Sequence, residues 1–369
     1  MTRLRLTCLF LLVAAVGCDG ADPIDVVGRA DRSLYVANQG NFSDNNGSVT
    51  RYDLDTEEVT PDAVPNLGGL VQNLYSAPGE LYVLLNFDDS FTTGNGRVDV
   101  VDVESGARTR QLDVRTPRAF GVRSATSVGP AEVYVSNLYD ATVTPLNLIT
   151  GATGEPVAVG AFPEGVVSVS GRTYVANAGF GSGTTLSVFD TDYAAATGDA
   201  VGTIDGLCQG PRTLLADREL EVWVVCTGTR DFESGEVTGG AVVVLDGATG
   251  AVRQRFDSDG LLGSATNGTD AVVVGDEVFV IGDGAVLRFD ARANALAATL
   301  PVAGAPIGAI AYDAAAERIY LGRPDAASPY TVDGVVTIHD RAGAQVGQFG
   351  AGLAPSAFAF ASTAPIREG

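Results

Sequence analysis

The chain of 369 residues contains no lysine, one histidine and four cysteines, and each shortage excludes a class of chemistry. Without lysine there is no phosphate-binding loop of the Gly-x-x-x-x-Gly-Lys type. One histidine, His339, excludes histidine-rich ligation of copper or haem, and no Gly-x-Ser-x-Gly sequence presents a nucleophilic serine. The cysteines lack the spacing of a zinc site. The sequence therefore predicts no metal ligands, no cofactor and no catalytic triad.

The charge balance excludes another group of functions. All 23 basic residues are arginine, against 45 aspartates and glutamates, and the formal net charge is -22. Nucleic acids and anionic lipid headgroups are bound by neutralising their phosphates, and a strongly acidic surface repels them. No nucleic-acid partner is therefore expected.

The amino terminus has the features of an export signal. Arg3 and Arg5 precede the apolar residues 6–16, a run too short to span a bilayer. The following residues, 15–18, resemble the bacterial lipobox, in which the cysteine becomes lipidated and is the first mature residue. This implies a signal peptide at 1–17, lipidation of Cys18 and a tether at 18–30. Ala15 stands where the lipobox usually has leucine, so a plain secretory signal stays open.

Two cysteines remain once Cys8 and Cys18 are assigned to the export segment. In an oxidising compartment two leftover thiols often pair, so Cys208 and Cys226 form a candidate disulfide. Two separate buried thiols are the alternative.

A short apolar strand pattern recurs seven times. Its aromatic residues lie about 40 to 56 residues apart, the period of a four-stranded propeller blade. The copies are residues 35–38, 82–86, 134–137 and 174–177, which end in asparagine, and the weaker 222–226, 278–282 and 319–322. A second strand that ends in Asp or Asn follows each copy, and turn residues come next.

These strands are almost continuously apolar, as expected where neighbouring blades cover both faces. The pattern predicts an all-β, seven-bladed propeller of four-stranded antiparallel blades over residues 31–362, followed by a tail at 363–369. The first copy lacks a strand directly before it, whereas residues 354–360 form an extra strand after the last blade. We therefore expect the C-terminal strand to complete the first blade, which closes the ring and removes exposed sheet edges.

The Tyr-Val-x-Asn quartets at 35–38, 134–137 and 174–177 resemble those of the YVTN-repeat β-propellers. The copy at 82–86 has one insertion, and three blades lack the asparagine. The resemblance covers roughly residues 34–361. It implies a seven-bladed bacterial protein that is secreted or attached to the surface, similar in fold to the quinoprotein amine-dehydrogenase propellers. It implies no shared catalytic residues.

The loops between the second and third strands vary greatly in length. Residues 282–284 show that a tight hairpin is sufficient, whereas five other blades insert much longer segments on the same rim. Candidate binding residues lie in these loops, at the strand ends and beside the innermost strands. They are Asn38, Phe42, Asn86, Phe87, Arg118, Asn137, Tyr139, Asn177, Phe180, Arg212, Arg230 and Tyr330.

Two functions remain open. The first is a monomeric, lipid-anchored binding or scaffold module of the cell envelope, whose long loops bind a protein, peptide or carbohydrate. The second is a periplasmic propeller enzyme, a lyase, lactonase or quinone-dependent oxidoreductase, with arginines and carboxylates over the central channel. Acidic clusters such as Asp88-Asp89 leave calcium at one loop open, although none forms an EF-hand loop.

The lipid anchor gives the first testable prediction. Cys18→Ala removes the acylated sulfur, so the protein should move from the membrane fraction to the soluble fraction of the producing bacterium. Cell fractionation and immunoblotting measure this. Membrane association that survives the substitution would contradict lipidation of Cys18.

Overall fold

The computed structural model describes residues 32–87, 95–126, 129–193, 201–230, 234, 237–257, 271–304 and 306–362. The predicted signal peptide at 1–17, Cys18, the tether at 18–30, the Asp88-Asp89 cluster and the tail at 363–369 lie outside the described residues. The predictions made for them stay predictions.

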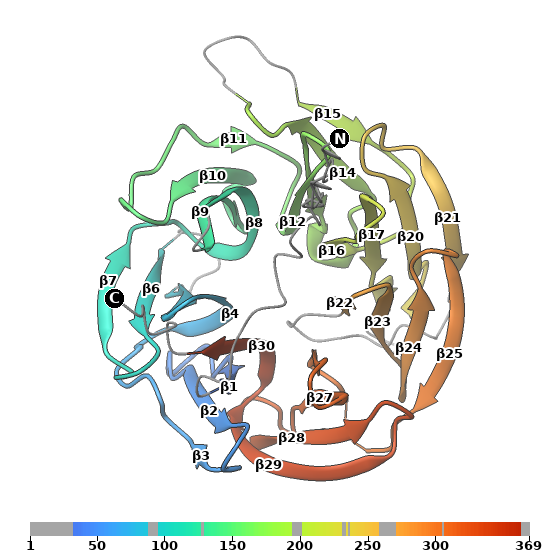
Figure 1. The fold of residues 1–369 in the computed structure, drawn as a ribbon. Coiled ribbons are helices and arrows are strands. Elements are labelled where there is room, and N and C mark those ends of the chain that lie inside the picture. Colours follow the sequence, from blue (N-terminus) through green and yellow to red (C-terminus); the bar gives the residue numbers. More distant parts are fainter. Residues whose placement is uncertain are drawn as a thin grey trace, which may run out of the picture.

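Seven four-stranded antiparallel sheets form a ring, which confirms the predicted fold (Figure 1). We number the blades 1 to 7 and give their strands from the centre outward. Blade 1 contains β30 (Pro355–Ser362), β1 (Arg32–Asn38), β2 (Ser48–Asp53) and β3 (Val59–Thr60). Blade 2 contains β4 (Leu70–Ala77), β5 (Glu80–Asn86), β6 (Gly96–Asp102) and β7 (Arg108–Leu112). Blade 3 contains β8 (Pro117–Thr126), β9 (Gly129–Asn137), β10 (Thr142–Asn147) and β11 (Val157–Ala158).

The remaining blades follow the same order. Blade 4 contains β12 (Pro163–Val169), β13 (Arg172–Asn177), β14 (Thr185–Asp190) and β15 (Gly202–Ile204). Blade 5 contains β16 (Pro211–Ala216), β17 (Glu221–Cys226), β20 (Ala241–Asp246) and β21 (Val252–Asp257). Blade 6 contains β22 (Ala271–Val274), β23 (Glu277–Gly282), β24 (Ala285–Asp290) and β25 (Ala295–Pro301). Blade 7 contains β26 (Ala309–Asp313), β27 (Arg318–Arg323), β28 (Asp333–Asp340) and β29 (Gln345–Leu353).

Two small elements lie in the long loops. The strands β18 (Thr229–Arg230) and β19 (Val237–Thr238) form a two-stranded ribbon between β17 and β20. A short 3-10 helix, η1 (Gly179–Gly181), lies between β13 and β14. Both elements belong to loops that join second and third strands, on the rim that we call the loop rim.

The ring closes as predicted, because β30 pairs with β1 inside blade 1. The pairing runs antiparallel from Arg32 opposite Ser362 to Asn38 opposite Pro355, with Tyr35 opposite Ala359. The first and last described strands thus share one sheet, and the innermost strand of blade 1 comes from the far end of the described chain. This pairing leaves no gap in the ring of sheets (Figure 1).

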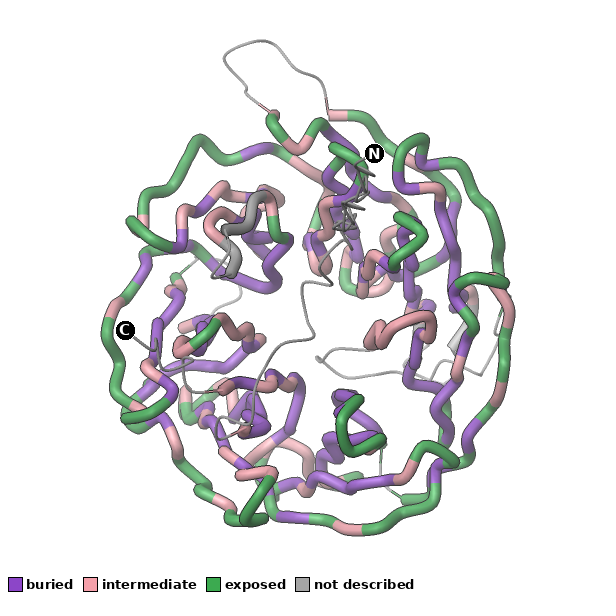
Figure 2. Tube along the Cα trace, in the orientation of Figure 1, coloured by how far each residue is buried: buried purple, intermediate pink, exposed green. Residues whose placement is uncertain are grey.

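The core lies between the blades, since alternate residues of each second strand face opposite neighbours. In β1, Tyr35 and Ala37 pack towards blade 2, whereas Leu34 and Val36 pack towards blade 7. The second strands are therefore buried on both faces, which explains their continuous apolar sequence. The outermost strands are largely exposed, as the green outer edge of the ring shows (Figure 2).

The Asp or Asn residue at the end of each third strand organises the following turn. Asp246, for example, accepts hydrogen bonds from the backbone N–H groups of Ala248 and Thr249 and from the Thr249 hydroxyl. The Thr249 hydroxyl and the nearby Arg253 lower the pKa of Asp246 to about 2. Asp53, Asp102, Asn147, Asp190, Asp290 and Asp340 make similar bonds to backbone N–H groups. The predicted turn chemistry is confirmed.

In blades 3 and 4 the asparagine at the end of the second strand fastens the chain that leads into the innermost strand. Asn137 donates through Nδ2 to the carbonyl of Arg115 at 2.6 Å, and the Gly160 N–H donates to Oδ1 of Asn177 at 3.0 Å. Arg115 and Gly160 lie just before β8 and β12. The asparagines thus join two segments of one blade through buried hydrogen bonds.

Blade 5 has a covalent bond in the corresponding place. Cys226 ends β17 and forms a disulfide with Cys208, which lies just before β16, with their Cα atoms 6.0 Å apart. Like Asn137 and Asn177, Cys226 is the residue that pairs with the proline that begins the innermost strand. Among the seven repeat copies, only the copy in blade 5 has cysteine at the position of the asparagine. In that blade the disulfide therefore takes the place of the asparagine hydrogen bonds.

Removal of this disulfide should destabilise the protein. The double variant Cys208→Ser/Cys226→Ser should lose about 2–4 kcal/mol of unfolding free energy, because the bond closes a loop between residues 18 positions apart. Urea denaturation followed by the fluorescence of the buried Trp223 measures the loss. A reductant should destabilise the wild type and leave the double variant unchanged. Equal stability of the two proteins without reductant would contradict this role.

Candidate functional site

The innermost strands β8, β12 and β16 begin on the loop rim with a bulge. In β8 the pairing moves from Pro117 opposite Asn137 to Phe120 opposite Val135, and in β12 from Pro163 opposite Asn177 to Val166 opposite Val175. In β16 it moves from Pro211 opposite Cys226 to Thr213 opposite Val225. The residues that the pairing skips include Arg118, Glu164 and Arg212. Bulges bend a strand and redirect side chains, which is why they are frequent next to active sites.

The residue before each proline supports this geometry. Thr116, Phe162, Gly210 and Ala354 all have a positive φ, the left-handed conformation that only glycine adopts without cost. Each chain therefore turns sharply and enters its innermost strand through the fixed φ of proline. The repeated turn places the residue after proline at the start of the bulge in blades 1, 3, 4 and 5.

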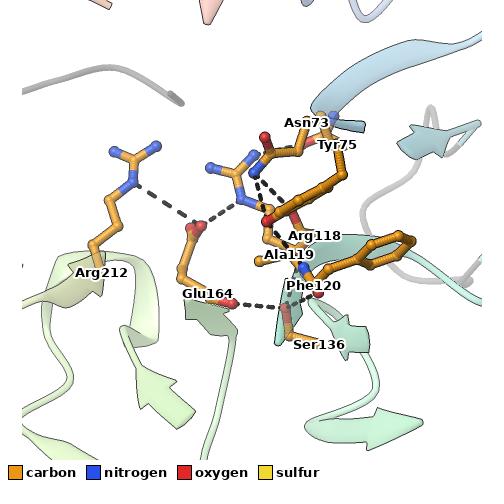
Figure 3. A network of polar contacts seen from close by, with 9 residues as sticks. Asn73, Tyr75, Arg118, Ala119, Phe120, Ser136, Glu164 and Arg212 are labelled. Atoms are coloured by element: carbon orange, nitrogen blue, oxygen red, sulfur yellow. Dashed lines mark hydrogen bonds and ion pairs between the residues drawn. The ribbon is translucent and has the colours of Figure 1, made fainter. Parts of the chain in front are cut away.

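Three charged side chains from three different blades converge at the centre of the ring (Figure 3). Arg118 of blade 3 forms an ion pair with Glu164 of blade 4 through Nε. Nε of Arg212, from blade 5, lies 4.0 Å from the same carboxylate oxygen, Oε2 of Glu164. The terminal nitrogens of Arg212 point away from Glu164 (Figure 3). The three groups carry two positive charges and one negative charge.

These charges are largely shielded from water. The exposed fractions of the Arg118, Glu164 and Arg212 side chains are 6%, 15% and 11%. Arg118 also donates through Nη1 to Oε1 of the buried Gln72, at 2.7 Å. Where water is largely excluded, the effective dielectric constant is low and an ionic interaction is stronger than in bulk water. An anion that reaches the two guanidinium groups is therefore bound more strongly than at an exposed site.

Side chains of the same blade and of neighbouring blades supply the hydrogen bonds that the bulges leave unmade in the sheet. The Ala119 N–H donates to the hydroxyl of Ser136 at 3.0 Å, and that hydroxyl donates to the carbonyl of Glu164 at 2.6 Å. The Phe120 N–H donates to the hydroxyl of Tyr75, from blade 2, at 3.0 Å. The backbones that carry Arg118 and Glu164 are therefore fixed to one another by Ser136 (Figure 3).

Loops of blades 1 and 7 bring aromatic residues to the same place. Phe42 and Tyr330 are in edge contact, with ring centroids 6.0 Å apart, and Asn41 donates to the carbonyl of Tyr330. Burial raises the pKa of Tyr330, although the guanidinium groups of Arg212 and Arg118 oppose the rise. Tyr330 therefore remains a protonated hydrogen-bond donor close to the two arginines.

A cavity of about 80 Å³ forms at this point. Its walls combine Arg118, Glu164 and Gln72 of the innermost strands with Phe42, Tyr139 and Phe180 of the loops; Gln39, Leu70, Asn86 and Leu138 complete the lining. A hollow of about 550 Å³ lies elsewhere, on the outer flank between β7 and residues 150–153. Of these two cavities, the central one is lined by Arg118 and Glu164, and Arg212 lies beside Glu164.

The structure brings together some of the predicted binding residues and separates others. Phe42, Asn86, Arg118, Tyr139, Phe180, Arg212 and Tyr330 lie at or beside the central cavity. The four asparagines, Asn38, Asn86, Asn137 and Asn177, are buried at the strand ends, where the bonds of Asn38, Asn137 and Asn177 to strand hydroxyls favour the structural role. Phe87 packs under Arg97, with 4.5 Å between the guanidinium carbon and the ring centroid.

The remaining predictions concern Arg230, His339 and metal binding. Arg230 belongs to the ribbon strand β18, but its side chain lies outside the described part. His339 is buried, and its ring nitrogens contact Thr337 and the carbonyl of Gly343, as expected of a core histidine. Within the described ranges, no group of three or more His, Cys, Asp or Glu residues could hold a metal ion.

Sequence reasoning missed Glu164, Gln72 and Ser136. Glu164 follows Phe162-Pro163 just as Arg118 follows Thr116-Pro117 and Arg212 follows Gly210-Pro211, so the shared x-Pro-x pattern could have found it. Ser136 occupies the position that is alanine in the quartets at 35–38 and 174–177. A polar residue in place of that alanine was the available signal.

Comparison with known proteins confirms the fold. No protein-family model and no curated protein matches the chain. Among solved structures, the chain is similar to Pseudomonas aeruginosa periplasmic gluconolactonase PpgL, with a TM-score of 0.63 and 17% identity over 90% of this chain and 100% of that one. A candidate 6-phosphogluconolactonase from Bacteroides fragilis gives a TM-score of 0.64 and 13% identity over 90% and 98% of the two chains.

A third similar structure is Kuenenia stuttgartiensis hydrazine synthase, with a TM-score of 0.59 and 18% identity over 78% of this chain and 88% of that one. At these identities the likeness shows a shared propeller fold. The resemblance to YVTN-repeat proteins has no matching family model and stays a prediction. Among the described residues, no helix has the length and hydrophobicity to cross a membrane.

The support that Ser136 gives to the site can be tested by stability. Ser136→Ala should cost about 1–3 kcal/mol of unfolding free energy. The substitution removes the hydroxyl that bonds the Ala119 N–H and the Glu164 carbonyl, so that both backbone groups lose this hydrogen-bond partner. Ser182→Ala is the control, since its hydroxyl bonds the Gly179 carbonyl on the exposed surface of the same rim. That variant should stay within about 0.5 kcal/mol of wild type in urea denaturation. A similar effect of both substitutions would contradict the role of Ser136.

Proposed function

We propose that the protein is a hydrolase of the lactonase type, which opens the ring of a sugar lactone at the central cavity. The observation that carries the proposal is the convergence of Arg118, Glu164 and Arg212 in one partly desolvated place. A carboxylate between two guanidinium groups provides a candidate base together with cations for a developing oxyanion. The lactonase names of two structural neighbours, PpgL and the Bacteroides fragilis protein, agree with this choice.

The proposed reaction adds one water molecule to the lactone. Glu164 accepts a proton from water while the water oxygen bonds to the carbonyl carbon. Arg212 and Arg118 stabilise the negative charge on the carbonyl oxygen, and the Tyr330 hydroxyl supplies a further hydrogen bond. The ring C–O bond then breaks, and the proton passes from Glu164 to the departing ring oxygen. The product is an open-chain hydroxy acid, which releases its acid proton to solvent, and the resulting carboxylate lies beside the two arginines.

Of the two functions that the sequence leaves open, the structure supports the enzyme better than the non-catalytic scaffold. A scaffold requires no buried charges at the ring centre, and buried charges are costly unless they are paired. The hydrogen bonds that the hydroxyls of Ser136 and Tyr75 accept from the backbone hold the charged bulges in a defined geometry, as a preorganised catalytic site requires.

The proposal is tested by measuring hydrolysis of D-glucono-1,5-lactone and of related 1,4-lactones above their spontaneous rates. We expect the purified protein to open at least one of them. Glu164→Gln should lower kcat/KM about 10²- to 10⁴-fold and Arg212→Ala about 10²- to 10³-fold, because they remove a base and an oxyanion-stabilising charge.

Arg292→Ala is the matched control, since Arg292 forms exposed ion pairs with Asp276 and Glu219 outside the site. Its activity should equal that of wild type. Urea denaturation should show that each variant folds. Hydrolysis that is absent in wild type, or unchanged in the folded Glu164→Gln variant, would contradict the proposal.

A further inference from the structure

One wall of the central cavity is aromatic and partly open to solvent. Phe180 contacts Phe162, with ring centroids 3.9 Å apart, and Tyr139 lies against both rings at 6.2 Å from Phe162 and 6.4 Å from Phe180. Phe180 is 64% exposed, and both Phe180 and Tyr139 line the cavity that contains Arg118 and Glu164. We call Tyr139, Phe162 and Phe180 the aromatic wall.

The backbone does not explain why residue 180 is phenylalanine. Phe180 has a φ of 54°, and its neighbours Gly179 and Gly181 also have positive φ values. Glycine adopts this conformation freely, whereas a residue with a side chain does so at a cost of roughly 1–2 kcal/mol. A third glycine would fit the turn better. The aromatic side chain is therefore present in spite of the local geometry, and such strain is concentrated at ligand-binding sites.

The solvent-exposed position of residue 180 does not explain the choice of phenylalanine either. Most of the Phe180 ring remains in water, so burial against Phe162 recovers only part of the hydrophobic gain that a core phenylalanine provides. An exposed ring beside a cavity with a few convergent polar groups is instead the composition of a small-molecule site.

We infer that the aromatic wall stacks on the ring face of a cyclic sugar acid whose carboxylate is bound by Arg118 and Arg212. A pyranose ring has an apolar face of C–H groups, which packs on an aromatic ring, and its carboxylate accepts the fork of hydrogen bonds that a guanidinium donates. This inference rests on the proposed function only for the location of the site. The cyclic acid is a ligand that occupies the site in place of the lactone, since both present their oxygens to the same two arginines. Open-chain acids, including the product of ring opening, lack the flat face and lose the stacking contact.

Calorimetric titration of three probes tests the inference. D-Galacturonate has a ring and a carboxylate, D-gluconate has only the carboxylate, and D-glucose has only the ring. We expect D-galacturonate to bind most tightly. Phe180→Ala should weaken its binding about 2- to 10-fold and leave D-gluconate unchanged, because only stacking is lost. Phe180→Trp keeps a ring and should retain the preference.

Leu220 offers a matched control. It is another exposed apolar residue with positive φ, at 57% exposure and 59°, and it lies in the turn between β16 and β17, at the opposite end of β16 from Arg212. Leu220→Ala should leave the binding of all three probes unchanged. Equal affinities for D-galacturonate and D-gluconate, or a Phe180→Ala variant that keeps the preference, would overturn the inference.

The outcomes separate this inference from the proposed function. Lactone hydrolysis that depends on Glu164 but shows no preference for ringed acids would overturn the stacking and leave the hydrolase intact. A preference for D-galacturonate that Phe180→Ala removes, without hydrolysis of any lactone, would support the aromatic wall as a binding site and contradict catalysis.

Discussion

The pairing of β30 with β1 is the constraint on which the rest of the structure depends. It joins residue 38 to residue 355 across almost the whole described chain and makes seven open sheets into a ring. Within a closed ring the innermost strands β8, β12 and β16 begin on the same rim, so residues 46 and 48 positions apart in sequence become neighbours. Arg118, Glu164 and Arg212 each lie on a different blade, and closure fixes the angles between those blades.

The local chemistry of each blade then determines where the side chains point. A residue with positive φ and a proline lead into the innermost strand, and a bulge follows. The residue after the proline is therefore not paired with the neighbouring strand. A hydrogen-bonded asparagine in blades 3 and 4, and the disulfide in blade 5, fasten the chain just before this bulge. The same device that stabilises the propeller therefore also orients its central charges, and stability and site geometry are coupled.

Much of this architecture could be predicted from the sequence, because it repeats. Seven copies ending near Asn38, Asn137 or their equivalents, and the orphan strand at 354–360, were sufficient to predict the blade number and the closure. The site was less accessible, since contacts between blades depend on register. Glu164 becomes significant only when Arg118 and Arg212 lie beside it, and Ser136 only when its hydroxyl reaches the Glu164 carbonyl. The asparagines repeat conspicuously, yet the bonds of Asn38, Asn137 and Asn177 are local to their own blades.

The central claim is that three blades jointly form one binding site for a sugar acid. A crystal structure of the protein soaked with D-galacturonate tests it most directly. The account predicts the carboxylate within hydrogen-bonding distance of the Arg118 and Arg212 guanidinium groups, with the sugar ring lying flat against Phe180. Density for the sugar at another place, such as the outer hollow beside β7, together with an empty ring centre, would contradict it.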